Sequence, residues 1–404
     1  MNILIVTESV PFPSTNGREL PIASIFGQLS KRHTIDLLVI TSKKETELKK
    51  IRNIPSSIRN TDFLFAKKTG NFKRLMYSML TFSHSISSYT YPGNDTKCLL
   101  QNKFYDFVWV SPVTFYTFID FCVKNNIHFF KKFAIGLNDS KTYLYRDYFN
   151  EVLYTGIINR KYLIYWLRSF LISGEEKNYL QKADLVHVQT NAEAAKVQKL
   201  LPELKRKIII APNGVKSELF GCTYNGADSN YILFMTNLDG DRKDESKWFI
   251  TKVWILIKQA LPAARLLIAG QPPKQPIDYI ANDSSIIING FADDLTQLYN
   301  TVSIAVVATF HGTGLINRIL DAFTAGVPVV STPQAIATFN NIKVEEHILS
   351  AQTPKLFADQ VIKLFNNKSY RTAVANAGRE YAKGCPTWEE TSIEIESKMQ
   401  SLLE

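Results

Sequence analysis

The chain has 404 residues, of which 45% are hydrophobic and 21% are charged. This length predicts two to three domains of roughly 150 residues each, and the composition excludes a disordered, collagen-like or disulfide-scaffold protein. The four cysteines lie far apart and form no Cys-x-x-Cys pair, so we expect free thiols in a reducing compartment rather than a zinc knuckle or a redox motif.

The net charge of +10 is concentrated in the first half of the chain. Residues 1–210 carry 30 Lys and Arg against 17 Asp and Glu, whereas residues 211–404 carry 17 against 20. This asymmetry predicts two domains with different partners. A basic domain suits nucleic acid, an anionic membrane surface or a phosphorylated acceptor. Nucleic acid is the weakest of these because the basic residues are dispersed and no reader motif is present.

In the first half, strand and helix patterns alternate. Met1–Val6 is an apolar run that predicts a buried strand; a polar loop follows, and apolar residues at every third position predict a helix ending near Arg32. Ile35–Thr41 predicts the next strand, so these elements form a parallel βαβ unit. Further strand-like runs occur at Phe107–Val110, Phe133–Leu137 and Leu185–Gln189, and another begins at Lys207.

Residues 67–82 (KKTGNFKRLMYSMLTF) interrupt this alternation with mixed basic and apolar side chains. Such a segment is typical either of a surface that lies on an anionic membrane or of a helix whose apolar face packs in the core. The start MNILIVTES lacks the pattern of a signal peptide, and the apolar run from Tyr162 is too short to span a bilayer. We expect a cytoplasmic protein, either soluble or peripheral on the inner face of the membrane.

The pattern restarts after the polar stretch CTYNGADSN. It predicts a helix at Lys247–Gln259 and strands at Tyr231–Asn237, Ala264–Gly270, Ser285–Gly290, Ser303–Thr309 and Val327–Thr332. The fold class is therefore α/β, with Rossmann-like, doubly wound domains at 1–207 and 208–385 and a helix over about 386–404 that is a candidate to pack back on the first domain. Because ligands of such sheets bind at the carboxyl ends of the strands, we expect the two domains to face each other across a cleft.

The most informative stretch is AVVATFHGTGLINRILDAFTAGVPVVST, from Ala305 to Thr332. A strand leads into a loop that contains Gly312, Thr313 and Gly314, and a helix and a second strand follow. Backbone N–H groups in such a loop, together with the helix N-terminus, can hold a diphosphate. Arg318 and Asp321 share one face of that helix, where Arg318 suits a phosphate and Asp321 suits ribose hydroxyls.

Ordered motifs along nearly the whole chain resemble GT-B glycosyltransferases of the family four type, in the subgroup found in bacterial surface polysaccharide biosynthesis. GTGLINRILDAFTAGVPVVST resembles the donor segment of that family. The other similar segments are MNILIVTESVPFPSTNGREL, ADLVHVQT, IIIAPNGV, ILFMTNLD, ARLLIAG and GFADDLTQLYNTVSIAVVAT. The resemblance implies the GT-B fold, a nucleotide-sugar donor bound by the C-terminal domain, and a transfer that retains the anomeric configuration.

Residue by residue, the resemblance places the donor diphosphate at Gly312–Gly314 and Arg318. It puts Asp321 where the family has a ribose-binding glutamate, and Phe291 where the backbone contacts the base. Asn237, Arg242 and Lys243 fall near the phosphate-binding cations of the family, although a solvated turn explains Arg242 and Lys243 equally well.

Two positions depart from the family pattern. The commonest form has two glutamates separated by seven residues, and His311 takes the place of the first, ten residues before Asp321. His311 either contacts the donor sugar or phosphate in catalysis or caps the following turn. Ile316 stands where many members of the subgroup have arginine, so one phosphate contact is missing or comes from elsewhere.

The family places acceptor contacts in the first domain, where Asn16, Gly17 and Arg18 follow the first strand and Glu8 ends it. A plain βα connection is the alternative for Asn16, Gly17 and Arg18, and a cap of the loop is the alternative for Glu8. Asp139, in the segment AIGLNDSKTYLYRDY, is either an acceptor-binding carboxylate or base, or a helix cap. His33, in a helix-to-strand turn, is expected to be structural.

These observations predict a glycosyltransferase that moves a sugar from a nucleotide-sugar donor to a glycan or lipid-linked acceptor in surface polysaccharide or lipopolysaccharide assembly. Asp139, His311 and Arg318 are its predicted catalytic residues. Asp239 and Asp241 match a turn of the family rather than a metal-binding loop, so no metal or other cofactor is expected. The alternatives are a GT-B sugar-nucleotide epimerase and a catalytically silent GT-B scaffold subunit.

Overall fold

The structure, a computed structural model, describes residues 1–14, 17–68, 89–112, 115–137, 140–155, 160–224, 228–239, 243–281, 283–292, 294–310 and 314–404. Two compact units are present. The first comprises Met1–Tyr145, Trp166–Asn213 and Trp388–Glu404, and the second comprises Arg146–Tyr165 and Gly214–Thr387.

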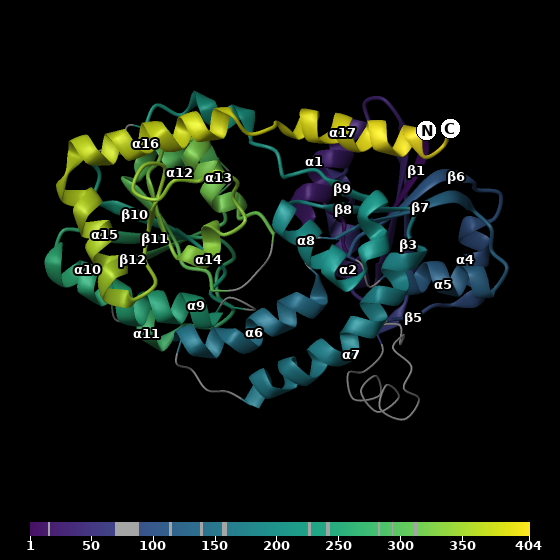
Figure 1. Cartoon of the computed structure of the whole chain (residues 1–404), viewed down its shortest axis with the longest axis horizontal. Coiled ribbons are helices and arrows are strands. Elements are labelled where there is room, and N and C mark those ends of the chain that lie inside the picture. Colours follow the sequence, from purple (N-terminus) through teal and green to yellow (C-terminus); the bar gives the residue numbers. More distant parts are fainter. Residues whose placement is uncertain are drawn as a thin grey trace. The chain divides into compact units, whose positions relative to one another are not determined.

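The first unit is built on a seven-stranded parallel sheet in the order β3-β2-β1-β6-β7-β8-β9 (Figure 1). The strands are β1 (Asn2–Thr7), β2 (Thr34–Thr41), β3 (Ile58–Phe65), β6 (Tyr105–Val110), β7 (Phe130–Gly136), β8 (Leu185–Val188) and β9 (Ile208–Ile210). Between β3 and β6 in the chain, β4 (Lys67–Lys68) and β5 (Tyr89–Thr90) form a separate, small antiparallel pair. The strand order reverses between β1 and β6, which is where ligands of doubly wound sheets bind.

Helices of the first unit are α1 (Glu19–Leu29), α2 (Lys44–Lys49), α4 (Gly93–Leu100), α5 (Tyr116–Lys124), α8 (Asn191–Leu200) and α17 (Trp388–Ser401). Helices α6 (Lys141–Thr155) and α7 (Arg160–Lys182) each have residues that belong to the first unit and residues that belong to the second. Because successive side chains of a strand point to opposite faces, Ile3 and Ile5 pack in one core with α1 and α17, whereas Leu4 and Val6 pack in another with α5.

The first unit extends to Asn213, beyond the predicted boundary at residue 207, because β9 pairs with β8 and so completes the first sheet. Helix α17 belongs to the same unit. It lies along α1 (Figure 1), and Trp388, Ile395 and Met399 are buried in the core of that face.

The second unit has a six-stranded parallel sheet in the order β12-β11-β10-β13-β14-β15. Its strands are β10 (Tyr231–Met235), β11 (Arg265–Ala269), β12 (Ile286–Gly290), β13 (Ile304–Val307), β14 (Val329–Ser331) and β15 (Leu349–Ser350). The order reverses between β10 and β13. With two parallel-sheet units of this kind, the predicted α/β, Rossmann-like fold class is confirmed.

The helices of the second unit are α9 (Lys243–Trp248), α10 (Ile255–Ala260), α11 (Asp278–Ala281), α12 (Leu295–Thr301), α13 (Asn317–Thr324), α14 (Pro333–Ile336), α15 (Pro354–Asn366) and α16 (Lys368–Lys383). A π-helical turn (Phe249–Trp254) joins α9 to α10, and a 3-10 helix, η4 (Ser217–Gly221), follows the start of the unit. The predicted helix at 247–259 thus begins four residues earlier, and this earlier turn carries the buried residues Glu245 and Ser246.

His187, on β8, is buried, and its Nε2–H donates to the carbonyl oxygen of Ala211 at 2.8 Å. Burial lowers the pKa of His187 to about 4, below the ordinary value of about 6.5 that holds in the unfolded chain. The unfolded state therefore binds a proton between these pH values and the folded state does not. We therefore expect this difference in proton binding at His187 to lower the free energy of unfolding by up to about 3 kcal/mol as the pH falls from 6.5 to 4.

Denaturant unfolding across this pH range measures the effect. His187→Gln keeps a donor for Ala211 and removes the titration, so its free energy of unfolding should fall less steeply than that of the wild type. Parallel pH profiles for the two proteins would contradict the prediction.

Candidate active site

The carboxyl edge of the second sheet brings together several predicted donor-site residues. Asn237 follows β10, Thr309 and Phe310 follow β13, and Arg318 and Asp321 lie on α13. Helix α13 begins at Asn317, three residues after Gly314, and ends at Thr324; Ala325 is its C-cap, and Gly326 follows with a φ of +73°. At this carboxyl edge, β10 and β13 are the two neighbouring strands between which the strand order reverses.

Arg318 is held at the ends of two strands. Its Nη1 donates to the carbonyl oxygen of Met235, the last residue of β10, and its Nη2 lies 3.4 Å from the hydroxyl of Thr309, two residues beyond β13. The half-buried guanidinium is therefore fixed at the reversal point by backbone and side-chain oxygens. A fixed cation at this place suits a group whose negative charge grows during a reaction.

The backbone of Thr309 and Phe310, which precede residues 311–313, is fixed by side chains from two other segments. The N–H of Thr309 donates to the hydroxyl of Thr332 at 3.0 Å, and that hydroxyl donates to the carbonyl oxygen of Thr309. The N–H of Phe310 donates to Oε1 of Glu245 at 2.8 Å. The ring of Phe310 also meets Trp248, on the same helix as Glu245, edge to face at 4.8 Å.

Asp321, one turn beyond Arg318, is buried with 6% exposure, and its Oδ2 pairs with Nζ of Lys216 at 3.0 Å. Burial raises the pKa of Asp321, and the Lys216 ammonium opposes that rise. Sequence reasoning singled out Asp321 but missed Lys216, which lies far from it in the chain.

The other described donor-site residues sit around the same edge. Oδ1 of Asn237 accepts a hydrogen bond from the N–H of Gln271 at 3.0 Å. Lys243 is exposed at the start of α9, and Phe291 is half exposed just after β12. The carbonyl oxygen of Gly314 accepts from the hydroxyl of Thr338 at 3.3 Å. Arg242, His311, Gly312 and Thr313 lie outside the described residues.

In the first unit, Glu8 follows β1 at the carboxyl edge of the sheet. Its Oε1 accepts from the hydroxyl of Tyr89 at 2.6 Å and lies 3.5 Å from Nζ of Lys68. Gly17 and Arg18 lie immediately before α1, and both are exposed. Asn16, Asp139 and residues 69–82 of the basic apolar stretch lie outside the described residues.

Two buried carboxylates that sequence reasoning missed support this edge. Glu47 accepts from the N–H of Val10, three residues after the end of β1, at 2.7 Å. Glu176, on α7, accepts from the hydroxyl of Ser140 and from the N–H groups of Lys141 and Thr142, each at 3.0 Å. Burial raises the pKa of Glu176. Because these contacts begin one residue after Asp139, Glu176 fixes the backbone that follows this predicted catalytic residue.

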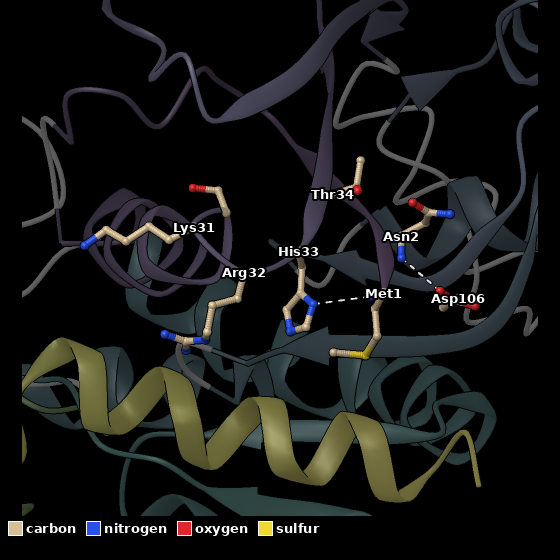
Figure 2. Close-up of a pocket in the computed structure, with 8 residues that line it drawn as sticks. Met1, Asn2, Lys31, Arg32, His33, Thr34 and Asp106 are labelled. Carbon is tan, nitrogen blue, oxygen red and sulfur yellow. Dashed lines mark hydrogen bonds between the residues drawn. The ribbon is translucent and has the colours of Figure 1, made fainter.

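A cavity of about 350 Å³ lies at the opposite, amino edge of the first sheet (Figure 2). It is lined by Met1, Asn2, Ser30, Lys31, Arg32, His33, Thr34 and Asp106. His33 lies between the Met1 amine (Nδ1, 3.2 Å) and Glu396 of α17 (Nε2, 2.7 Å). Through these contacts His33 joins α17 to the start of β1, as its expected structural role requires.

Comparisons with known proteins identify the second unit. Residues 229–367 match the model of the family described as glycosyl transferases group 1. This part of the chain is therefore similar to a glycosyltransferase domain. This domain and the fold support a glycosyltransferase enzyme. No curated protein sequence matches the chain.

Solved glycosyltransferase-like structures resemble the chain over its full length. Sucrose-phosphate synthase from Thermosynechococcus elongatus has a TM-score of 0.70 at 16% identity, covering 100% of this chain and 99% of its own. HepE of Anabaena, crystallised with UDP and glucose, has a TM-score of 0.63 at 12% identity, covering 98% and 99%. A TarM variant of S. aureus, crystallised with fondaparinux, alpha-GlcNAc-glycerol and UDP, has a TM-score of 0.65 at 11% identity, covering 100% of both chains. The fold is therefore GT-B.

Among the described residues, every helix is either too short or too polar to cross a bilayer.

Proposed function

We propose that this glycosyltransferase moves a hexose from a nucleotide-sugar donor to a glycan or lipid-linked acceptor in surface polysaccharide or lipopolysaccharide assembly. The observation that carries the proposal is the fixed guanidinium of Arg318 at the reversal point of the second sheet, next to the buried carboxylate of Asp321. The group 1 domain match covers this same region.

In the proposed donor site, Gly312, Thr313 and Gly314 offer backbone N–H groups to the diphosphate, and Arg318 balances its charge. Asp321 accepts hydrogen bonds from the ribose, and the backbone at Phe291 contacts the base. Asn237, Arg242 and Lys243 line the phosphate side. His311 contacts the donor sugar.

Breaking the anomeric bond leaves negative charge on the departing diphosphate. Donors that are fixed before the reaction stabilise that charge without reorganising. We propose that Arg318 and the loop amides supply this stabilisation, that no metal is required, and that the anomeric configuration is retained, as the family resemblance implies. Bound UDP in the HepE and TarM structures supports a uridine nucleotide as the first donor class to test.

We place the acceptor in the first unit, near Glu8, Asn16, Gly17 and Arg18, with Asp139 as its carboxylate or base. The surplus of Lys and Arg in residues 1–210 supports an acidic or lipid-linked acceptor on an anionic membrane surface. We therefore propose a cytoplasmic protein that binds peripherally to the inner face of the membrane.

A panel of nucleotide sugars, each incubated with and without an acceptor extract, tests the proposal. We expect release of nucleoside diphosphate from one donor, faster with acceptor and unaffected by a metal chelator. Epimerised donor without acceptor would favour the GT-B epimerase, and nucleotide binding without turnover would favour a silent scaffold subunit. Either result would overturn glycosyl transfer by this chain.

A further inference from the structure

The ion pair between Lys216 and Asp321 joins two segments of the second unit that are distant in the sequence. Lys216 precedes the 3-10 helix η4, and Asp321 lies on the second turn of α13. Their side chains meet at 3.0 Å, with side-chain exposures of 20% for Lys216 and 9% for Asp321. An ion pair at this depth differs from the freely moving pairs on a protein surface, which contribute little.

The backbone around Lys216 is fixed on both sides. The N–H of Val215 donates to the carbonyl oxygen of Pro386 at 2.9 Å. Leu219, on η4, is buried in the same core as Leu320 and Phe323 of α13. At the far end of η4, Nη1 of Arg379 donates to the carbonyl oxygen of Cys222 at 2.9 Å. The ammonium of Lys216 is therefore delivered to Asp321 by a rigid segment.

Only one of the two carboxylate oxygens of Asp321 is engaged. Lys216 contacts Oδ2, and within the described part of the chain no hydrogen bond is recorded to Oδ1. A carboxylate that binds the two adjacent hydroxyls of a ribose must be ionised and must keep acceptor positions open. Without a partner, a carboxylate this deeply buried becomes protonated instead.

We propose that Lys216 is a positioning residue of the nucleoside subsite: its ammonium orients the Asp321 carboxylate and keeps it ionised, so that Oδ1 accepts hydrogen bonds from the ribose. The inference rests on the proposed function and adds to it a residue that acts through Asp321. Other charged or titratable groups that interact with Asp321 are Glu218 on η4 and Tyr299 on α12, and Tyr299 also interacts with Arg318. Glu218 raises the pKa of Asp321, so Lys216 is the cation that opposes both burial and this neighbour.

Calorimetric titration of the full chain with UDP, and with ADP and GDP, tests the inference between pH 5 and pH 9. The nucleotide that binds is then compared with its 2′,3′-dideoxy analogue, which lacks the two ribose hydroxyls. The wild type should bind the dideoxy form about tenfold more weakly. Lys216→Met should bind the ribose form about tenfold more weakly than the wild type and should barely distinguish the two forms.

The pH dependence supplies a readout that a loss of packing would not produce. Binding requires ionised Asp321, so affinity falls as the pH drops through the pKa of this residue. Removing Lys216 raises that pKa further, and the acid limb of the binding curve should therefore move to higher pH in Lys216→Met. Lys216→Arg, which keeps the cation, should stay within about threefold of the wild type.

Lys368→Met is the matched control, because Lys368 forms a 2.8 Å pair with Asp228 on the exposed surface of the same unit. It should leave all affinities unchanged. If Lys216→Met fails to fold, Lys216→Gln carries the test: its amide can still donate to Oδ2 of Asp321 without a charge, so the acid limb should still move to higher pH.

Three results separate the possibilities. A wild type that binds none of the nucleotides overturns the proposed function, and the inference with it. A Lys216→Met variant that still prefers ribose, with an unmoved acid limb, overturns the inference alone. Loss of preference together with a shifted limb supports both.

Discussion

Arg318→Ala is expected to lower kcat/KM by about a hundredfold to a thousandfold. The guanidinium stands at the ends of β10 and β13, fixed by the Met235 carbonyl and the Thr309 hydroxyl. In the proposed reaction it faces a diphosphate that gains charge as the anomeric bond breaks, and removal of one such fixed donor typically costs this much. Initial rates of nucleoside diphosphate release give kcat and KM separately, and most of the loss should appear in kcat.

Two variants show whether the loss reflects charge stabilisation. Arg318→Lys keeps a cation but not the planar fork of donors, so it should recover only part of the rate. Arg371→Ala removes an arginine of α16 that donates in a similar way to the carbonyl oxygens of Leu364 and Phe365. It should lower the melting temperature and leave kcat close to that of the wild type. An Arg318→Ala enzyme with near-normal kcat would remove this residue from the chemistry.

The fold class was predictable because the evidence for it is local. Strand β1 is apolar at four successive buried positions, Ile3–Val6, as expected for a parallel strand covered on both faces. The alternation of such runs with helical patterns then specifies doubly wound sheets. Figure 1 shows that α17, the last helix of the chain, lies along α1. No local pattern specifies the partner of a terminal helix, and the sequence could only name the first domain as a candidate.

The residues that support the site were not predictable in the same way. Glu245 lies in a polar turn, KDES, which reads as solvated, yet tertiary contacts bury it under the backbone of Phe310. Lys216 meets Asp321 across 105 positions of sequence. Glu176 lies in a helix whose charged residues look like an ordinary polar face, although it is fully buried beside Ser140. In each case a long-range contact fixes the role, whereas motif spacing reports only neighbours along the chain.

Glu245→Leu is expected to lower kcat/KM by about tenfold to a hundredfold. The N–H of Phe310 would lose its acceptor inside the protein, at a cost of about 1–3 kcal/mol. Because Phe310 immediately precedes His311 and Gly312, relaxation of this backbone would displace the groups that we propose hold the donor, and a shift of about 1 Å can cost a hundredfold in rate. Steady-state kinetics and thermal unfolding of the same preparation measure both consequences.

Glu245→Gln is the matched control, since its amide oxygen can accept the same hydrogen bond from Phe310. If the hydrogen-bond acceptor for the Phe310 N–H is what matters, the glutamine variant keeps kcat/KM within about threefold of the wild type while the leucine variant does not. Trp248, three residues further along the helix, continues to pack against the Phe310 ring in both variants, so the difference between them isolates the backbone contact. A glutamine variant as impaired as the leucine one would show instead that the site needs the negative charge of Glu245, and would contradict the role assigned to it.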